Sequence, residues 1–364
     1  MTAKFHNPVH IKFGPGAIAS IPGLLCGCKA ALVTFPEAAA LGLVDRLHSL
    51  LGSSVAAVID RIEPNPDIAS LAPLYAEFWR NRSGVDAIVA VGGGSTLDTA
   101  KALMVGTESG RFDELLSLLA ENRPFRPHAV KRLIAVPTTA GTGSEVTPWA
   151  TIWDRDPRHP RKYSLHLDES WPQSAVIDPE LMLTLPRTVT IQSGLDALSH
   201  ALESIWNRNS NPISDTLAVS AARTVLSNLP ALVEDLANLR LRERLALAAL
   251  KAGLAFSNTK TALAHSISYE MTLRYGLPHG IACSFTLPMV LERAIGVLAD
   301  RDAMLAEIFD RPLNGAADWL TAFLVGLGVK TTFSDYGVTP DESESMIRRA
   351  LDGARGKNFI GVEA

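Results

Sequence analysis

The first half of the chain alternates short, continuously apolar runs with longer amphipathic stretches. Continuous apolar runs are typical of strands that are buried on both faces of a parallel sheet. The runs that predict strands are residues 30–34, 54–60, 86–91 and 132–137. Amphipathic stretches such as residues 67–80 separate them, so the pattern predicts a β-α-β alternation and an α/β layered domain.

The pattern changes after about residue 186, where apolar positions recur at helical spacing and strand-like runs become rare. We expect a helix to start near Pro186. Further helical spacing covers residues 201–206, 213–229, 241–256, 289–308 and 315–327. The predicted fold class is therefore α/β plus all-α, with a parallel-sheet domain over residues 1–185 and an all-helical domain over residues 186–364.

The bulk composition excludes several classes of protein. The 364 residues exceed the roughly 150 of one ordinary domain, which agrees with two domains. A net charge of −4, without a Lys/Arg block, predicts neither a nucleic-acid partner nor an anionic membrane. No apolar run approaches the roughly 20 residues of a membrane-crossing helix, and the N-terminus does not resemble a signal peptide. We expect a cytoplasmic protein.

The three cysteines, Cys26, Cys28 and Cys283, are expected to be small reduced thiols.

Two glycine-rich turns each follow a predicted strand. Residues 92–101 (GGGSTLDTAK) open a helix, where free backbone N–H groups favour phosphate; they match neither the Gly-x-Gly-x-x-Gly signature nor a P-loop. Residues 137–146 (PTTAGTGSEV) interleave hydroxyl donors with glycines. Either stretch alone would be explained by a tight turn or a cap. Two such turns at the carboxyl ends of strands, where open α/β sheets bind ligands, favour a dinucleotide.

One carboxylate and three imidazoles form a second candidate set. Asp196 and His200 are four residues apart, which places them on one face of a helix. His265 and His279 lie in apolar surroundings, where an unpaired ring would be costly. Each residue alone would be explained as a surface or core side chain, with His279 in a turn. Together they suit a divalent metal ion, Fe²⁺ or Zn²⁺, with a coordination position left for substrate.

These motifs, in this order and spacing, make the chain resemble the iron-containing (group III) alcohol dehydrogenases, which have the dehydroquinate synthase-like fold. The resemblance covers nearly the whole chain and is carried by residues 13–18, 63–66, 92–95, 138–145, 194–200 and 278–280. It implies a Rossmann-like dinucleotide-binding domain over residues 1–185 and a helical metal-binding domain over residues 186–364. It also implies a homodimer or a larger homo-oligomer.

The resemblance implies roles for individual residues. The metal ligands would be Asp196, His200, His265 and His279. The cofactor, NAD(H) or NADP(H), would lie against Gly93, Gly94, Ser95, Asp98, Thr138, Thr139, Thr142, Thr147 and Lys162. The implied reaction is hydride transfer between the nicotinamide and a metal-polarised carbonyl of a small aldehyde or alcohol.

Two positions depart from the family pattern. Many members have a second histidine four residues after the third ligand, associated with the nicotinamide and with proton transfer; here that position is Tyr269. Tyr269, water or the ribose hydroxyls would take over that role. Members that select NAD often have an acidic residue after the strand at residues 30–34, but here Phe35 follows, with Glu37 two residues later. The choice between NAD and NADP stays open.

The substrate is expected to be anionic. Lys260, about one and a half helical turns before His265, would face the pocket if the helix is continuous. The segment 155–162 adds further cations. Residues 203–207, 258–261, 265–269 and 356–361 are similar to the phosphonoacetaldehyde reductase branch, whose product is 2-hydroxyethylphosphonate. The alternatives are a 4-hydroxybutyrate, glycerol or general primary-alcohol dehydrogenase, a dehydroquinate synthase-type cyclase, a metal-dependent hydrolase and a non-catalytic nucleotide sensor.

Overall fold

The computed structural model describes residues 4–81, 84–121, 123, 125–156, 158 and 161–362. Two units divide the chain between them. The α/β unit comprises residues 8–139 and 144–182, and the helical unit comprises residues 1–7, 140–143 and 183–364. The short segment 140–143, in the second glycine-rich turn, therefore belongs to the helical unit.

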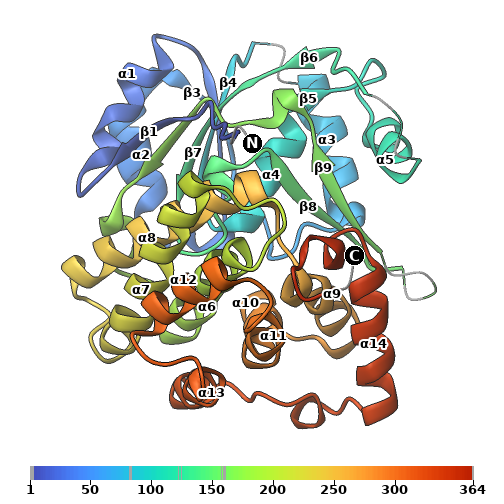
Figure 1. Cartoon of the computed structure of the whole chain (residues 1–364). Coiled ribbons are helices and arrows are strands. Elements are labelled where there is room, and N and C mark those ends of the chain that lie inside the picture. Colours follow the sequence, from blue (N-terminus) through green and yellow to red (C-terminus); the bar gives the residue numbers. More distant parts are fainter. Residues whose placement is uncertain are drawn as a thin grey trace. The chain divides into compact units, whose positions relative to one another are not determined.

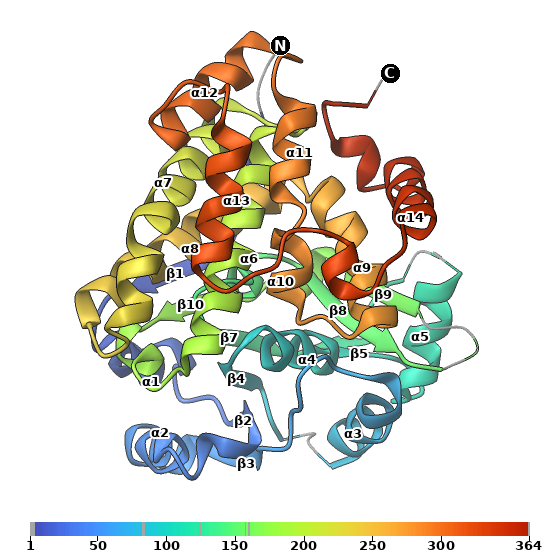
Figure 2. The same ribbon diagram turned by 90° about the horizontal axis from the view of Figure 1, so that it is seen from below.

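The α/β unit (Figure 1) is built on a six-stranded parallel sheet in the order β1-β10-β7-β4-β2-β3, and all six strands are labelled in Figure 2. Its strands are β1 (His10–Phe13), β2 (Ala30–Thr34), β3 (Val55–Ile59), β4 (Ala87–Gly92), β7 (Arg132–Pro137) and β10 (Ser174–Ile177). All four strands expected from apolar runs are confirmed, in β2, β3, β4 and β7. Two antiparallel pairs were not foreseen: β5 (Val105–Gly106) with β6 (Ala129–Val130), and β8 (Trp149–Asp154) with β9 (Arg161–His166).

Helices cover both faces of this sheet, as the apolar runs predicted. The helices are α1 (Ile21–Leu25), α2 (Leu43–Leu51), α3 (Ile68–Asn81), α4 (Gly94–Met104) and α5 (Phe112–Ala120). Alternate residues of β4 enter different cores: Ile88 and Ala90 pack with α3, α4 and α5, whereas Val89 and Val91 pack with α1 and α2. Short 3₁₀ turns are Ala17–Ser20, Pro36–Ala38, Gly52–Ser54, Ser144–Val146, Asp168–Ser170 and Pro179–Met182.

The helical unit contains no strand among its described residues. Its helices are α6 (Arg187–Ile205), α7 (Pro212–Glu234), α8 (Leu239–Thr259), α9 (Leu263–Tyr275), α10 (His279–Ser284), α11 (Leu287–Ala294), α12 (Ala299–Phe309), α13 (Ala316–Gly326) and α14 (Pro340–Asp352), with 3₁₀ turns at Ser334–Tyr336 and Gly356–Asn358. The two views of the ribbon show these elements from the side and from below (Figures 1 and 2). The all-helical prediction is confirmed.

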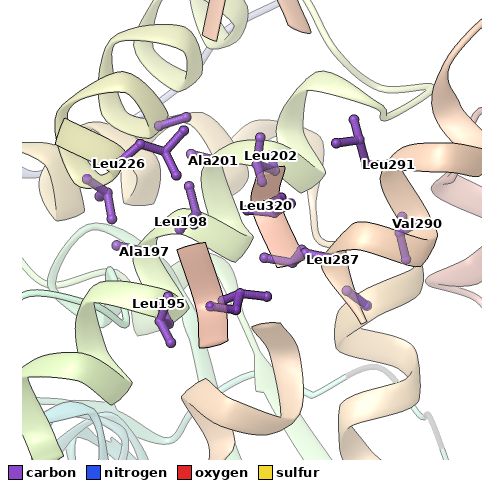
Figure 3. Close-up of a cluster of buried hydrophobic side chains, with 14 of the residues drawn as sticks. Leu195, Ala197, Leu198, Ala201, Leu202, Leu226, Leu287, Val290, Leu291 and Leu320 are labelled. Atoms are coloured by element: carbon purple, nitrogen blue, oxygen red, sulfur yellow. The ribbon is translucent and has the colours of Figure 1, made fainter. Parts of the chain in front are cut away.

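The core of the helical unit surrounds α6, which packs against α7, α8 and α10. Leu195, Leu198 and Leu202 of α6 lie in this core with side chains from α7, α11 and α13 (Figure 3). Helix α7 is long and apolar enough to cross a membrane by length and composition, the one such helix among the described residues. Because α7 packs against α6 and α8, its apolar character is explained by burial inside the helical unit.

Candidate functional site

Helix α6 carries three buried ionisable side chains. Asp196, His200 and Glu203 are each less than 5% exposed. The spacing predicted from sequence is confirmed, since Asp196 and His200 lie one turn apart and the His200 Nε2 is 3.8 Å from the Asp196 Oδ1. Burying this many polar groups is costly unless they have partners, so the group points to a function.

Glu203 organises the start of α9, and sequence reasoning had assigned it no role. Its carboxylate accepts hydrogen bonds from the backbone N–H groups of Ala262 and Ala264, which begin that helix. Its Oε2 also lies 2.6 Å from the His265 Nδ1. A carboxylate at a helix N-terminus is stabilised by the free N–H groups there, and the second contact fixes the His265 ring. The only sequence signal was a glutamate among apolar residues in the last turn of α6.

His279 is the first residue of α10, and the expectation that it lies in a turn is wrong. The next residue, Gly280, lets this helix approach α6 closely. A Cβ atom on Gly280 would lie 2.0 Å from the backbone oxygen of Gln192. The glycine therefore sets the distance between α6 and the His279 side chain.

The three elements bring the predicted metal-binding side chains together around Asp196. Its Oδ1 lies 3.5 Å from the His265 Nε2 and 3.8 Å from the Nε2 atoms of both His200 and His279. The Asp196 Oδ1 and the His265 Nε2 are buried without a hydrogen-bond partner among the described residues. Two buried polar atoms without hydrogen-bond partners, which face each other beside two more imidazoles, fit a divalent metal ion.

The protonation states of Asp196 and His200 also suit a metal ion. Burial alone would raise the pKa of Asp196, but the neighbouring His200, His279 and His265 outweigh it and hold that pKa well below its usual range. Burial lowers the pKa of His200 to about 4, so its ring is neutral at pH 7. The His200 Nδ1 lies 3.3 Å from the carbonyl oxygen of Gly141, which leaves the Nε2 facing Asp196. A carbonyl on one ring nitrogen is the usual orientation of a metal-binding histidine. Burial would lower the pKa of His265, but the neighbouring Cys283, Glu203 and Asp196 raise it, so a metal ion must displace a proton from this ring.

Cys283 also belongs to the cluster, which the sequence analysis did not foresee. Donor atoms of Asp196, His265, His279 and Cys283 all lie within 4.8 Å of one another. The sulfur is buried one turn after His279 on α10 and lies 3.5 Å from the His279 Nε2. The chain thus offers a thiol beside the carboxylate and the imidazoles.

The first glycine-rich turn lies where the sequence predicted it, between β4 and α4. Gly93 is the N-cap of α4 and Gly94 is its first residue. A Cβ atom on Gly92 would lie 2.3 Å from the Thr96 Oγ1, so no larger residue fits there. The Ser95 hydroxyl accepts a hydrogen bond from the Asn65 N–H at 2.9 Å. The free N–H groups of this helix start are available to an anion.

Asp98 and Thr147 are part of a buried polar network centred on Lys101. The Lys101 Nζ donates to the Ser144 hydroxyl at 2.8 Å and lies 3.4 Å from the Thr147 hydroxyl, and Ser144 in turn donates to Asp98 at 2.7 Å. Burial lowers the pKa of Lys101 to about 8. The network ties α4 to the turn after β7. Sequence reasoning quoted Lys101 in the motif but gave it no role.

The other predicted cofactor residues lie in the same turn and in the β8–β9 hairpin. Thr138 and Thr139 directly follow β7, and Thr142 is in the segment that belongs to the helical unit. The Lys162 Nζ lies 5.2 Å from the centre of the Trp153 ring. Burial raises the pKa of the Asp98 carboxyl, and the charge of Lys162 is among those that oppose this shift. In the basic segment 155–162, residues 157, 159 and 160 lie outside the described residues.

The two predicted catalytic residues lie in different environments. Tyr269 is partly buried one turn after His265 on α9, with the Arg355 guanidinium 4.7 Å from the centre of its ring. The helical relationship expected for Lys260 is wrong. Lys260 is an exposed C-cap of α8 with φ +64°, and residues 261 and 262 separate it from α9. The chain leaves the helix there because the next N–H groups turn to Glu203.

The residues that follow β2 favour neither NAD nor NADP, in agreement with the sequence. Phe35 follows the strand, is partly buried and precedes the 3₁₀ turn that contains Glu37. The side chain of Glu37 is exposed.

Comparison with known proteins agrees with this geometry. The model described as iron-containing alcohol dehydrogenase matches residues 8–179, and the model described as the C-terminal part of the Fe-containing alcohol dehydrogenase family matches residues 190–363. A 1,3-propanediol dehydrogenase of Klebsiella pneumoniae is 32% identical over 93% of this chain and 90% of its own length. An NAD-dependent methanol dehydrogenase of Bacillus methanolicus is 31% identical over 97% and 94%.

A solved structure is similar over the full length. The sulfoacetaldehyde reductase from Bifidobacterium kashiwanohense, in complex with NAD⁺, matches with a TM-score of 0.90 and 30% identity, over 100% of this chain and 95% of its own. The fold, the family models and the sequence relatives all agree. The chain belongs to the iron-containing alcohol dehydrogenase family and is an oxidoreductase that acts on CH–OH groups.

Proposed function

We propose that the protein is a metal-dependent, NAD(P)-linked reductase of a small anionic aldehyde, with phosphonoacetaldehyde as its substrate and 2-hydroxyethylphosphonate as its product. The observation that carries the metal-dependent reaction is the pair of buried, unpartnered atoms, the Asp196 Oδ1 and the His265 Nε2, inside a cluster of further donors. We assign Asp196, His200, His265 and His279 as the ligands of Fe²⁺ or Zn²⁺.

When bound, the metal ion supplies a Lewis acid for the carbonyl oxygen, and the reduced nicotinamide supplies the hydride. The chain's own groups hold these ligands in place. Glu203 keeps the His265 Nδ1 occupied and thereby presents the Nε2. The carbonyl of Gly141 does the same for His200. Both rings are thus oriented before any ion binds, which lowers the entropic cost of binding.

Tyr269 is assigned as the proton donor to the product alkoxide. Burial raises the pKa of its hydroxyl, although Arg355 and His265 oppose that shift. The hydroxyl therefore keeps its proton at neutral pH and has one to give. In the direction of alcohol oxidation, the same oxygen would accept the proton.

The glycine-rich turn at Gly93–Ser95 is assigned to the pyrophosphate of the dinucleotide, because its helix-start N–H groups suit an anion. Thr138, Thr139, Thr142 and Thr147 offer hydroxyls along the cofactor, and Asp98 and Lys162 complete the proposed set. The NAD⁺ bound by the sulfoacetaldehyde reductase and the NAD dependence of the methanol dehydrogenase support NAD(H). NADP(H) is the alternative, since Phe35 cannot repel a 2′-phosphate.

The anionic substrate is supported by the sulfoacetaldehyde reductase, because sulfoacetaldehyde is itself an anionic aldehyde. The 1,3-propanediol and methanol dehydrogenases favour the alternative, a neutral primary alcohol. The other two alternative substrates, 4-hydroxybutyrate and glycerol, would likewise be an anionic and a neutral primary alcohol.

The test is a steady-state assay of metal-depleted protein reconstituted with Fe²⁺ or Zn²⁺, with NADH and NADPH compared. Phosphonoacetaldehyde should be reduced with a higher kcat/KM than butyraldehyde or succinic semialdehyde. His265→Ala should lose nearly all turnover and most metal. Turnover in metal-depleted protein or in His265→Ala would refute the metal assignment, and equal efficiency on butyraldehyde would refute the anionic substrate.

A further inference from the structure

We propose that Arg355 binds the anionic group of the substrate, so that this one guanidinium sets the preference for aldehydes that carry a phosphonate, sulfonate or carboxylate. The inference rests on the proposed function and adds its specificity residue. The Arg355 guanidinium lies 4.7 Å from the centre of the Tyr269 ring. Its side chain is partly buried, and no described carboxylate forms an ion pair with it.

The position of Tyr269 connects Arg355 with the reaction. Tyr269 follows His265 by four residues on α9, so the two side chains lie on the same face of that helix. The charge of His265 and that of Arg355 both act on the Tyr269 hydroxyl. A cation stacked on this ring is therefore on the side of α9 that carries the metal-binding histidine.

The segment that carries Arg355 is fixed beside α9. Helix α14 and the 3₁₀ turn Gly356–Asn358 both pack against α9. The Asn358 side-chain amide donates to the Thr261 carbonyl oxygen at 2.9 Å, and the Ser266 hydroxyl donates to the Ala350 carbonyl oxygen at 3.1 Å. Bonds on either side of Arg355 thus hold its backbone, which lowers the entropy that the side chain loses when it binds an anion.

Neighbouring arginines on the same two helices are already engaged. Arg349 of α14 forms an ion pair with Glu270 at 2.9 Å, and Arg274 of α9 pairs with both Glu270 and Glu342. Of these three arginines, Arg355 alone pairs with no acidic side chain among the described residues. Lys260, the cation expected from sequence, is exposed at the end of α8.

The chemistry of the pair suits an oxyanion. A guanidinium presents parallel N–H donors that match two oxygens of a phosphonate, sulfonate or carboxylate. Stacking on an aromatic ring satisfies one face of the guanidinium and leaves its edge free for such bonds. A neutral aldehyde would gain nothing from this edge and would leave a partly buried charge without a partner.

The experiment compares Arg355→Met and Arg355→Lys with the metal-loaded wild-type protein on phosphonoacetaldehyde and on butyraldehyde. Loss of a charged hydrogen-bond donor should lower kcat/KM for phosphonoacetaldehyde by about 10- to 100-fold and leave butyraldehyde within a few fold. Arg355→Lys should recover part of the loss. Arg349→Met, an arginine on the neighbouring helix that is paired with Glu270, is the matched control and should leave the ratio of the two efficiencies unchanged.

An unchanged ratio in Arg355→Met, or an equal loss on both aldehydes, would overturn the inference while the reductase activity stands. Wild-type protein that reduces neither aldehyde would refute the proposed function instead. Calorimetry of 2-hydroxyethylphosphonate binding to metal-loaded protein is an independent test of whether Arg355 binds the anionic group. Weaker binding by Arg355→Met supports the inference, whereas equal binding, or none by wild type, overturns it. Circular dichroism of each variant establishes that it is folded.

Discussion

The Glu203 carboxylate lies 2.6 Å from the His265 Nδ1, and both side chains are almost completely buried. The same carboxylate accepts the N–H groups that begin α9. One glutamate on α6 therefore fixes both the helix that carries His265 and the rotation of the His265 ring. Because the ring nitrogen it holds is the Nδ1, the Nε2 is the atom left for a metal ion.

We expect Glu203→Gln to weaken metal binding by about 10- to 100-fold, the usual effect of losing a partner of a metal-binding histidine. An amide has almost the shape of the carboxylate but holds the ring less strongly and accepts the N–H groups of α9 without a charge. Competition with a chromophoric chelator measures the affinity. Glu234→Gln, an exposed glutamate at the end of α7, is the control. Unchanged affinity in Glu203→Gln would contradict the orienting role.

The sequence predicted the parts of the fold that depend on local burial. Strands such as β4 are buried on both faces, so they appear as unbroken apolar runs. The four-residue β10 has only the short apolar run 175–177 and was not assigned as a strand. The helix expected over residues 289–308 is two helices in the structure, α11 and α12, because Gly296 adopts φ +81° between them.

The candidate site was predictable in composition but not in its supporting contacts. The residue types and spacing of Asp196 and His200 indicated a shared helix face, and the family resemblance supplied the other two histidines. Nothing in the local sequence shows that Glu203 caps α9, that Cys283 joins the cluster, or that Lys260 leaves the helix. The roles of Glu203 and Lys260 depend on contacts between residues about 60 positions apart, and the place of Cys283 depends on α10 packing close to Asp196 of α6.

Gly280→Ala should displace α10 from α6. The added Cβ would meet the Gln192 carbonyl oxygen at 2.0 Å, so the helix that begins with His279 must move. We expect a loss of about 1–3 kcal/mol in the free energy of unfolding, as for other overpacked interiors, together with weaker metal binding. Urea unfolding and chelator competition measure the two effects. Gly326→Ala, an exposed site on α13 with open space around it, should do neither; equal effects at both sites would contradict the close-approach argument.

Glu145 should make the protein less stable as the pH rises. Burial raises the pKa of this carboxyl from 4.5 to about 7, with Lys101 opposing the shift. Between these two values the unfolded chain has already released the proton that the folded chain still holds, so stability falls with increasing pH. Over this pH range the free energy of unfolding falls by about 3 kcal/mol because of Glu145. In Glu145→Gln that part of the pH dependence between pH 4.5 and 7 should disappear from urea unfolding curves. The exposed Glu169→Gln should retain the wild-type slope, and a wild-type slope in Glu145→Gln would rule out this origin.

Substitution with Co²⁺ distinguishes two possible ligand sets. One is Asp196 with the three histidines, and in the other Cys283 takes the place of His200. Cys283 is within reach of the other donors, but burial raises the pKa of its thiol, whereas His200 is neutral at pH 7 and oriented by the Gly141 carbonyl. We therefore expect Co²⁺ to bind through Asp196 and the three histidines, without the near-ultraviolet charge-transfer band that a thiolate ligand produces. Cys283→Ser should leave the spectrum unchanged, and His200→Ala should alter it and weaken binding. A strong charge-transfer band that Cys283→Ser abolishes would replace His200 by a sulfur ligand and would favour softer metals such as Zn²⁺ at this site.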